Sequence, residues 1–368
     1  MGSLSPQLPS PSSPLPSSET FYRIYASFCT AKISNWIECY DPSNNAWHRV
    51  TTIPGLIENQ VLKSFSMVSI GHFIYIIGGR LCQKFPGHEP DEIFEVNVEV
   101  LQRVLRYDLV KDVWSKCAPL RVPRFDFACT VSVCDNKIYV AGGQSKLSSA
   151  RGTSSAEVYD PALDEWKLLP NMNTLRYKCV AVTWQGKIHV VGGFAEKRDS
   201  DGEVVPWGIM ERSSAEVYDF ENAKWDLIRG MWQLDVPPNQ IVAVDDKLFS
   251  SGDCLKVWKG HIEAFDGELN IWNEVDGSHL ETLSSPISTS VANWPPIKRQ
   301  YLTMAPIGSQ LYFLAGYRMP GEISRSKCDV HVFDTSANGG GWNSLEPIEE
   351  EGEKELCSHC CALRQPQM

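Results

Sequence analysis

The heptapeptide Ser-Ser-Ala-Glu-Val-Tyr-Asp occurs twice in this chain, at residues 154–160 and again at residues 213–219. Seven identical residues at a separation of 59 positions indicate an internal duplication. Self-similarity at a regular spacing is typical of folds that stack one structural unit many times. The duplicated segment therefore predicts a repeat fold.

The last two residues of the heptapeptide belong to a wider pattern, in which an aromatic residue and an Asp are followed by a Trp. The pattern occurs six times, and the aromatic residue precedes the Trp by seven positions in five copies and by nine in the last. Polar residues that satisfy their own backbone lie between them, so each copy predicts a strand, a turn and a second strand. The repeat residues are Tyr40, Tyr107, Tyr159, Tyr218, Phe265 and Phe333, with Trp47, Trp114, Trp166, Trp225, Trp272 and Trp342.

A second module precedes most copies, and it is an apolar run that ends in two small residues. These runs are residues 73–79, 137–143, 187–193, 247–252 and 310–316. An alternating strand and a tight polar turn come before each run, which predicts a β-hairpin. Glycine allows a close backbone approach where a side chain would clash. The glycine doublets are Gly78, Gly79, Gly142, Gly143, Gly192 and Gly193.

Two hairpins make a four-stranded antiparallel sheet, and the pattern returns about every 47 to 70 residues. Each sheet is apolar on both faces and must stack on its neighbours, and radial stacking gives a β-propeller. We therefore predict an all-β fold, with residues 21–365 as a single propeller of six blades. The Tyr and Trp rings fill the wedges between blades. Residues 1–20 are rich in Ser and Pro, and we expect a disordered tail there.

These residues resemble the kelch repeat, in which a Gly-Gly doublet is followed by Tyr-Asp and then by Trp. Copies five and six depart from it, since Ser251-Gly252 and Ala315-Gly316 replace the doublet and Phe replaces Tyr. The chain is most similar to the propeller of plant F-box/kelch-repeat proteins, through residues 36–42 and the twin heptapeptides. In that family the F-box recruits a ubiquitin ligase and the propeller holds the substrate. Only the short tail precedes the repeats, so we expect no F-box.

The first blade lacks an innermost strand at the N-terminus. Residues 23–29 align with residues 137–143 and so resemble a second strand, whereas residues 356–363 resemble an innermost strand with nothing after it. We predict that the C-terminal strand pairs with the N-terminal strands in one blade. Such pairing closes the ring and removes an open sheet edge.

The long connections follow the second strand of a blade or join two blades, so all of them emerge on one face. They are residues 80–103, 144–155, 194–214, 226–238, 273–299 and 317–327. Length concentrated on one face marks a binding surface. Interface hot spots are rich in arginine and tryptophan. The predicted face carries arginines at the start of innermost strands, a lysine at the matching place of another blade, and tryptophans in its loops. The predicted partner-binding residues are Arg124, Arg176, Arg299, Lys63, Trp207, Trp232 and Trp294. A structural role, in which the arginines pair with backbone carbonyls or loop acids, is the alternative.

The composition excludes several classes of function. A net charge of −11 disfavours nucleic acids and anionic membranes as partners. The histidines are isolated, and neither a phosphate-binding loop nor a nucleophile elbow occurs. Residues 357–361 hold three cysteines and a histidine, but no second ligand pair for zinc is visible. We therefore expect no catalytic residues, no metal and no cofactor.

The sequence leaves three functions open. The first is a non-enzymatic module that binds another protein through the loop-rich face, as a monomer in the cytoplasm or nucleus. The second is a substrate-recognition component linked to an SCF-type ubiquitin ligase, whose F-box is missing or belongs to a longer product. The third is a small-molecule or metal-dependent enzyme at the propeller mouth, which would require histidines and carboxylates to converge there.

Overall fold

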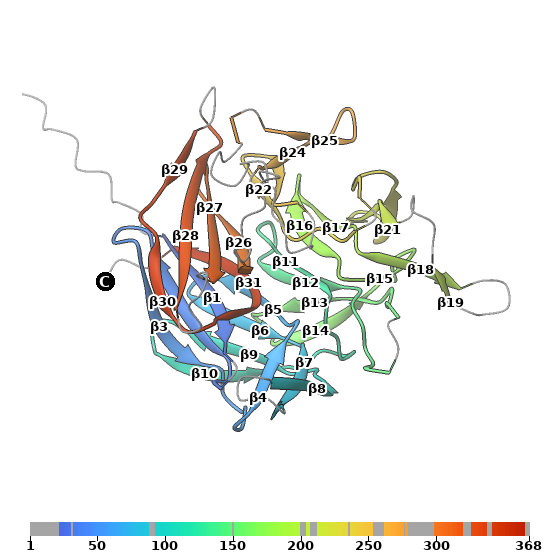
Figure 1. Cartoon of the computed structure of the whole chain (residues 1–368). Coiled ribbons are helices and arrows are strands. Elements are labelled where there is room, and N and C mark those ends of the chain that lie inside the picture. Colours follow the sequence, from blue (N-terminus) through green and yellow to red (C-terminus); the bar gives the residue numbers. More distant parts are fainter. Residues whose placement is uncertain are drawn as a thin grey trace, which may run out of the picture.

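The computed structural model describes residues 22–30, 32–87, 93–148, 151–198, 204–206, 212–234, 236–252, 261–275, 277–278, 298–318, 325–336 and 341–364. Every regular element in these residues is a β-strand (Figure 1), which confirms the all-β prediction. The predicted tail at residues 1–20 lies outside the described residues. The described part of the chain contains no helix that is long and apolar enough to cross a membrane.

The strands form six main antiparallel sheets in the described residues. The first sheet contains β1 (Tyr22–Cys29), β2 (Trp36–Asp41), β3 (Ala46–Thr52) and β31 (Glu355–Arg364). The second contains β5 (Ser66–Ile70), β6 (Phe73–Ile77), β9 (Val104–Asp108) and β10 (Val113–Cys117). The third contains β11 (Ala128–Ser132), β12 (Lys137–Ala141), β13 (Ala156–Asp160) and β14 (Glu165–Leu169).

The remaining sheets follow the same order. The fourth contains β16 (Val180–Trp184), β17 (Lys187–Val191), β20 (Ala215–Asp219) and β21 (Lys224–Ile228). The fifth contains β22 (Ile241–Val244), β23 (Lys247–Ser250), β24 (Glu263–Asp266) and β25 (Ile271–Glu274). The sixth contains β26 (Lys298–Ile307), β27 (Gln310–Arg318), β28 (Arg325–Asp334) and β29 (Trp342–Ser344), and β30 (Ile348–Glu351) also pairs with β28.

Two small sheets arise from the long insertions. One contains β4 (Gln60–Lys63), β7 (Arg80–Pro86) and β8 (Ile93–Val100). The other contains β15 (Leu175–Tyr177), β18 (Phe194–Arg198) and β19 (Val204–Pro206). Figure 1 shows both at the periphery, where β7 and β8 lie below the inner strands and β18 and β19 project to the right.

The first sheet joins the two ends of the described chain. β1 pairs with β31 from Tyr22 opposite Arg364 to Cys29 opposite Glu355, with shifts in register between them. The inner strands of neighbouring sheets contact one another in the order β31, β5, β11, β16, β22 and β26, and β26 also contacts β31. Each sheet is therefore flanked by two others along its inner strand.

The aromatic residue and the Trp of each repeat lie opposite each other on neighbouring strands. Tyr159 pairs with Trp166, with ring centroids 5.0 Å apart, and the other five copies have the same register. The indole N–H of Trp166 donates to the carbonyl of Ala118, in the segment that enters the sheet. Asp160 accepts the N–H of Ala162 and so shapes the turn, as the Asp of every copy does with the residue two positions on.

The hydrophobic core lies between neighbouring sheets. Tyr159 and Trp166 of the third sheet pack in one cluster with Tyr75 of the second. Tyr218 and Trp225 of the fourth sheet pack in the same way with residues of the third. The repeat aromatics thus hold one sheet against the next.

The glycine doublets lie where one sheet meets the entering backbone of the next. Gly78 and Gly79 have φ values of +61° and +94°, and Gly79 donates its N–H to the carbonyl of Arg124. A Cβ on Gly78 would stand 2.6 Å from that carbonyl oxygen. Gly142 and Gly143 make the same contact with the carbonyl of Arg176. Any side chain at the first glycine would push the two sheets apart.

We expect Trp166→Ala to lower the free energy of unfolding by about 3–5 kcal/mol, because it removes a buried ring between two sheets. Urea denaturation of the purified chain measures this. Leu168→Ala is the matched control, since Leu168 lies in the same strand but is 60% exposed. The control should change the free energy by less than about 1 kcal/mol. Equal losses of unfolding free energy in the two variants would contradict the assignment of Trp166 to the core.

Candidate interaction surface

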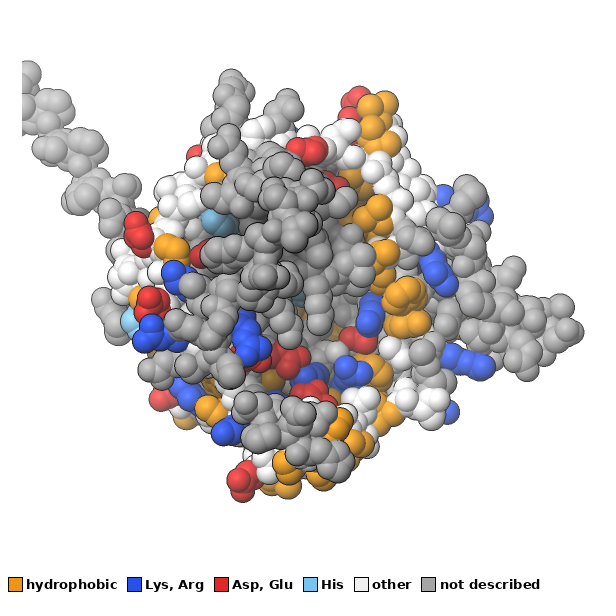
Figure 2. Space-filling model, viewed as in Figure 1, with side chains coloured by type: hydrophobic (Ala, Val, Ile, Leu, Met, Phe, Trp, Pro, Cys, Tyr) orange, Lys and Arg blue, Asp and Glu red, His pale blue; other side chains and the backbone are white. Residues whose placement is uncertain are grey.

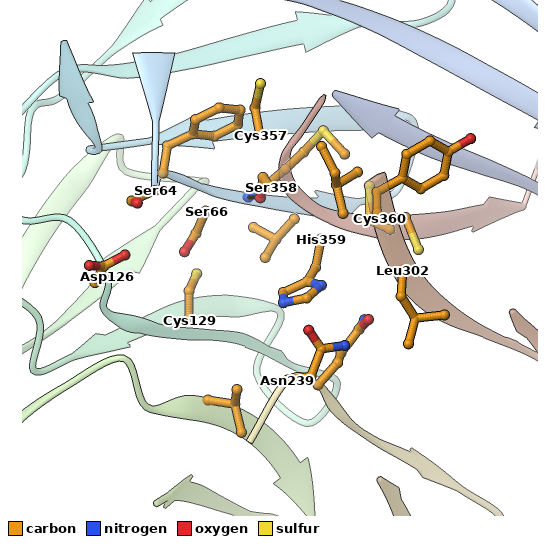
Figure 3. Close-up of a pocket in the computed structure, with 18 of the residues that line it drawn as sticks. Ser64, Ser66, Asp126, Cys129, Asn239, Leu302, Cys357, Ser358, His359 and Cys360 are labelled. Carbon is orange, nitrogen blue, oxygen red and sulfur yellow. Dashed lines mark hydrogen bonds between the residues drawn. The ribbon is translucent and has the colours of Figure 1, made fainter. Parts of the chain in front are cut away.

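The six inner strands surround a cavity of about 1420 Å³. Residues of β5, β11, β16, β22, β26 and β31 all contribute to its wall. Figure 3 shows the ring of His359 pointing into this space, with Cys129 and Asn239 on either side. Burial lowers the pKa of His359 to about 4, and a hydrogen bond with the backbone of Asn239 opposes that shift. The imidazole is therefore neutral near pH 7.

One end of the cavity carries a network of ion pairs. The ammonium of Lys63 lies 2.6 Å from Glu95 and 2.8 Å from Glu355, and Lys84 lies 3.7 Å from Glu95. Burial lowers the pKa of Lys63, but hydrogen bonds with Glu355 and Glu95 outweigh burial and raise it above its ordinary value. Figure 2 shows basic and acidic side chains interspersed around the middle of this face. The network joins the end of β4, the β7–β8 hairpin and β31.

Two of the predicted partner-binding residues, Arg124 and Arg176, have no exposed surface. The guanidinium of Arg124 donates to the carbonyl of Gly142 at 2.8 Å and to Glu157 at 2.6 Å. Arg176 donates to the carbonyl of Gly192 at 3.0 Å and to Glu216 at 3.4 Å. Burial lowers the pKa of both arginines, and the charge of the paired glutamate opposes it. The partner-binding prediction is wrong for these two arginines, and the structural alternative holds.

The same contacts explain the duplicated heptapeptide. Its Ser and Glu side chains, Ser155 and Glu157 in one copy, receive hydrogen bonds from Arg124. Glu157 also accepts the backbone N–H groups of Arg121 and Val122, in the segment that leads into the sheet. The second copy repeats this arrangement with Ser214, Glu216 and Arg176. The repeated residues therefore hold in place the segments that lead into the inner strands of the third and fourth sheets.

The positions equivalent to these arginines are different in the first two sheets. At the entry to the second sheet, Lys63 corresponds to Phe125, one residue after Arg124, because the carbonyls of Lys63 and Phe125 lie beside the second glycine of each doublet. The cation in the first sheet is Lys354, which lies 2.7 Å from Glu38 and 3.0 Å from Glu350. The sequence reasoning missed Lys354. The signal was Glu38, which precedes Tyr40 by two positions as Glu157 precedes Tyr159.

The predicted tryptophans fall into two groups. Trp232 is 1% exposed, packs against Trp272 and donates its indole N–H to the carbonyl of Val236. It belongs to the core, so its assignment to a partner-binding surface is wrong. Trp207 and Trp294 lie outside the described residues, and Arg299 is described only as a backbone position of β26, opposite Tyr317.

An apolar surface that the sequence reasoning did not single out lies on the β7–β8 hairpin. Phe85 and Phe94 pair across the hairpin and are each 48% exposed, and Val96 and Val98 are each 52% exposed. β8 is the edge strand of its sheet. Figure 2 shows hydrophobic side chains at the lower rim of the molecule, over the region of β4, β7 and β8. We call these four residues the hairpin patch. Its sequence signal was the alternation of apolar residues in 94–100.

The described residues contain no group of three or more His, Cys, Asp or Glu side chains arranged to hold a metal ion. Residues 357–361, the segment weighed as half a zinc site, are among these described residues. Cys357 and Cys360 lie in β31 among core residues. The described features that could contact a ligand or partner are therefore the ion pairs of Lys63 and Lys84, the hairpin patch and the neutral His359.

Comparison with known proteins agrees with this repeat architecture. Residues 27–54 and 127–173 match the Kelch motif. The chain is 30% identical over 326 residues to the F-box/kelch-repeat protein SKIP30 of Arabidopsis thaliana, covering 87% of this chain and 77% of that protein. It is 31% identical over 202 residues to the F-box/kelch-repeat protein At1g16250 of the same plant, covering 54% of this chain and 46% of that protein.

A human relative, the Kelch repeat and BTB domain-containing protein 12, is 30% identical over 173 residues, which cover 44% of this chain and 26% of that protein. The chain belongs to the kelch-repeat family, and its plant relatives are F-box/kelch-repeat proteins. This confirms the resemblance seen in the repeats. The chain spans about half the length of several of these relatives.

We expect Glu157→Ala to lower the free energy of unfolding by about 3–5 kcal/mol, because it leaves the buried charge of Arg124 without its partner. The double variant Arg124→Leu/Glu157→Ala should lose less than the sum of the single changes Arg124→Leu and Glu157→Ala, since it removes both charges. Urea denaturation of the four proteins of the cycle measures the coupling. Strictly additive losses would show that the pair does not interact.

We expect protonation of His189 to destabilise the fold in acid. Burial lowers the pKa of His189 from 6.5 to about 4. Between these values the unfolded chain binds the proton first, so the free energy of unfolding falls as the pH falls from 6.5 to 4. His189→Gln should make this decline shallower, by up to about 3 kcal/mol over the interval. Urea denaturation at a series of pH values tests it, and an unchanged slope would contradict it.

Proposed function

We propose that this chain is a non-enzymatic protein-binding module and that its six sheets are the blades of one closed propeller. The contacts between successive inner strands and the pairing of β1 with β31 support the closed ring. The binding face is the one that carries the long insertions, including the β7–β8 hairpin beside the cavity mouth.

The observation that carries the proposal is the hairpin patch. Phe85, Phe94, Val96 and Val98 are about half exposed, although the chain buries most of the aromatic residues of its repeats between the sheets. Contiguous exposed apolar side chains mark interaction sites in soluble proteins, because water contact with them is unfavourable. Lys84 and Glu95 alternate with Phe85 and Phe94 along the two strands, so their ion pair lies on the opposite side of the hairpin, toward the cavity.

A second candidate function is substrate recognition for an SCF-type ubiquitin ligase, with the F-box supplied by a longer product. The names of the relatives favour it, since several are F-box/kelch-repeat proteins. The same face would then hold the substrate. We also propose that the protein acts as a monomer in the cytoplasm or nucleus.

We expect a Phe94→Ser/Val96→Ser variant to lose its bound proteins in affinity capture from a plant extract, because the change removes the centre of the hairpin patch. The control is Leu269→Ser, which replaces a leucine that is 66% exposed in a turn of the fifth sheet. Both variants should keep the unfolding midpoint of the unmodified chain. Mass spectrometry should find partners retained by the control and depleted at least about tenfold by the hairpin variant.

Identical captured proteins in the two variants would move the binding face away from the hairpin. Recovery of cullin and adaptor subunits with the unmodified chain would favour the ligase function over a free-standing module. Recovery of other proteins alone, lost in the hairpin variant, would favour the free-standing module.

A further inference from the structure

Two cysteines meet where the first and last strands of the described chain pair. Cys29 is the last residue of β1, and Cys357 is the third residue of β31. In the register of these strands Cys29 lies opposite Glu355, Phe28 opposite Leu356 and Ser27 opposite Ser358. Cys357 is therefore the additional residue at an irregularity, the kind of position where a strand redirects a side chain. Both side chains belong to one core cluster.

The two thiols differ in their surroundings. The ammonium of Lys84 lies 3.8 Å from the sulfur of Cys29 and also donates to the carbonyl of Thr30. The hydrogen bond with Cys357 lowers the pKa of Cys29, burial raises it, and the charge of Lys84 adds to the lowering. Burial and the same hydrogen bond raise the pKa of Cys357. The described cysteines with perturbed pKa values are otherwise all raised.

One member of the pair lies on the cavity wall. Cys357, Thr30, Lys84 and Glu355 line the cavity, and Figure 3 shows Cys357 at its edge. Cys29 itself has no exposed surface. Hydrogen peroxide would therefore have to enter past Cys357 to meet the sulfur of Cys29.

We propose that Cys29 and Cys357 are a peroxide-sensitive dithiol that oxidises to a disulfide between β1 and β31. The thiolate of Cys29 attacks one oxygen of hydrogen peroxide, which forms a sulfenic acid and releases hydroxide as the O–O bond breaks. The hydroxide takes the proton of Cys357 and becomes water. The thiolate of Cys357 then attacks the sulfur of the sulfenic acid, the S–O bond breaks, and the departing hydroxide takes a proton from solvent. Two thiols and one peroxide give one disulfide and two waters.

The disulfide would tie together strands that are more than 300 residues apart in the sequence. A cross-link that closes a loop of this length restricts the unfolded chain strongly. Oxidation therefore stabilises the pairing of β1 with β31 and fixes the end of the cavity where Lys63 and Lys84 lie. This inference depends on the strand pairing and not on the proposed function.

The test exposes the full-length reduced chain to hydrogen peroxide, followed by alkylation and peptide mapping without reductant. The expected result is one linked peptide pair that contains Cys29 and Cys357, with a rise in the thermal unfolding midpoint that dithiothreitol reverses. Cys29→Ser should abolish both effects. Cys357→Ser should leave a sulfenic acid on Cys29 that dimedone labels. Lys84→Met should slow the oxidation at least about tenfold, because it removes the cation beside the thiolate.

The matched control is Cys129→Ser, because Cys129 also lines the cavity but its pKa is raised by burial. This variant should form the same linked peptide at the same rate. Peroxide-treated unmodified chain without the Cys29–Cys357 peptide would overturn the proposal. This reading uses a chain that retains both cysteines, so a variant that fails to fold does not leave the proposal undecided.

Discussion

The sheets of this protein meet at backbone carbonyl oxygens that leave no room for a side chain opposite them. The carbonyl of Arg124 accepts the N–H of Gly79 and lies where a Cβ on Gly78 would stand, and the carbonyl of Arg176 repeats the contact with Gly142 and Gly143. The distance between neighbouring sheets is set at these points. The Tyr and Trp rings fill the wedge that opens outward from each contact.

The same residues that supply these carbonyls also hold their own sheets together. The side chain of Arg124 is neutralised by Glu157 and reaches the carbonyl of Gly142, the next doublet along the chain. A buried ion pair of this kind contributes little to stability beyond apolar packing, but it fixes one geometry, since a displaced glutamate would leave the charge unpaired. The buried ion pairs thus fix the geometry of the inner strands, and the packed Tyr and Trp rings hold the sheets together.

Local patterns made most of the fold predictable, whereas the partners of individual side chains could not be predicted from the sequence. The Tyr-Asp turn, the cross-strand Trp and the doublets depend on residues within about ten positions of each other, so their spacing could be recognised in the sequence. Arg124 pairs with Glu157, which lies 33 positions away in the sequence, and Lys354 pairs with Glu38, which lies 316 positions away. Pairings at such separations follow from topology, which explains why buried arginines were taken for surface residues and Lys354 was missed. The hairpin patch was overlooked because its alternation resembles a core strand.

The pairing of β1 with β31 has a consequence for biosynthesis. Among the described strands β1 leaves the ribosome first, yet β31, the strand that covers its inner edge, leaves last. Until β31 is made, the nascent chain therefore presents an unpaired β-edge with buried-type residues such as Ile24 and Phe28. Sheets two to six can form in order behind it, but the first must wait until β31 has been made. Cells that make this protein need to shield that edge, and heavy polysome loading raises the risk that two unfinished chains pair with each other.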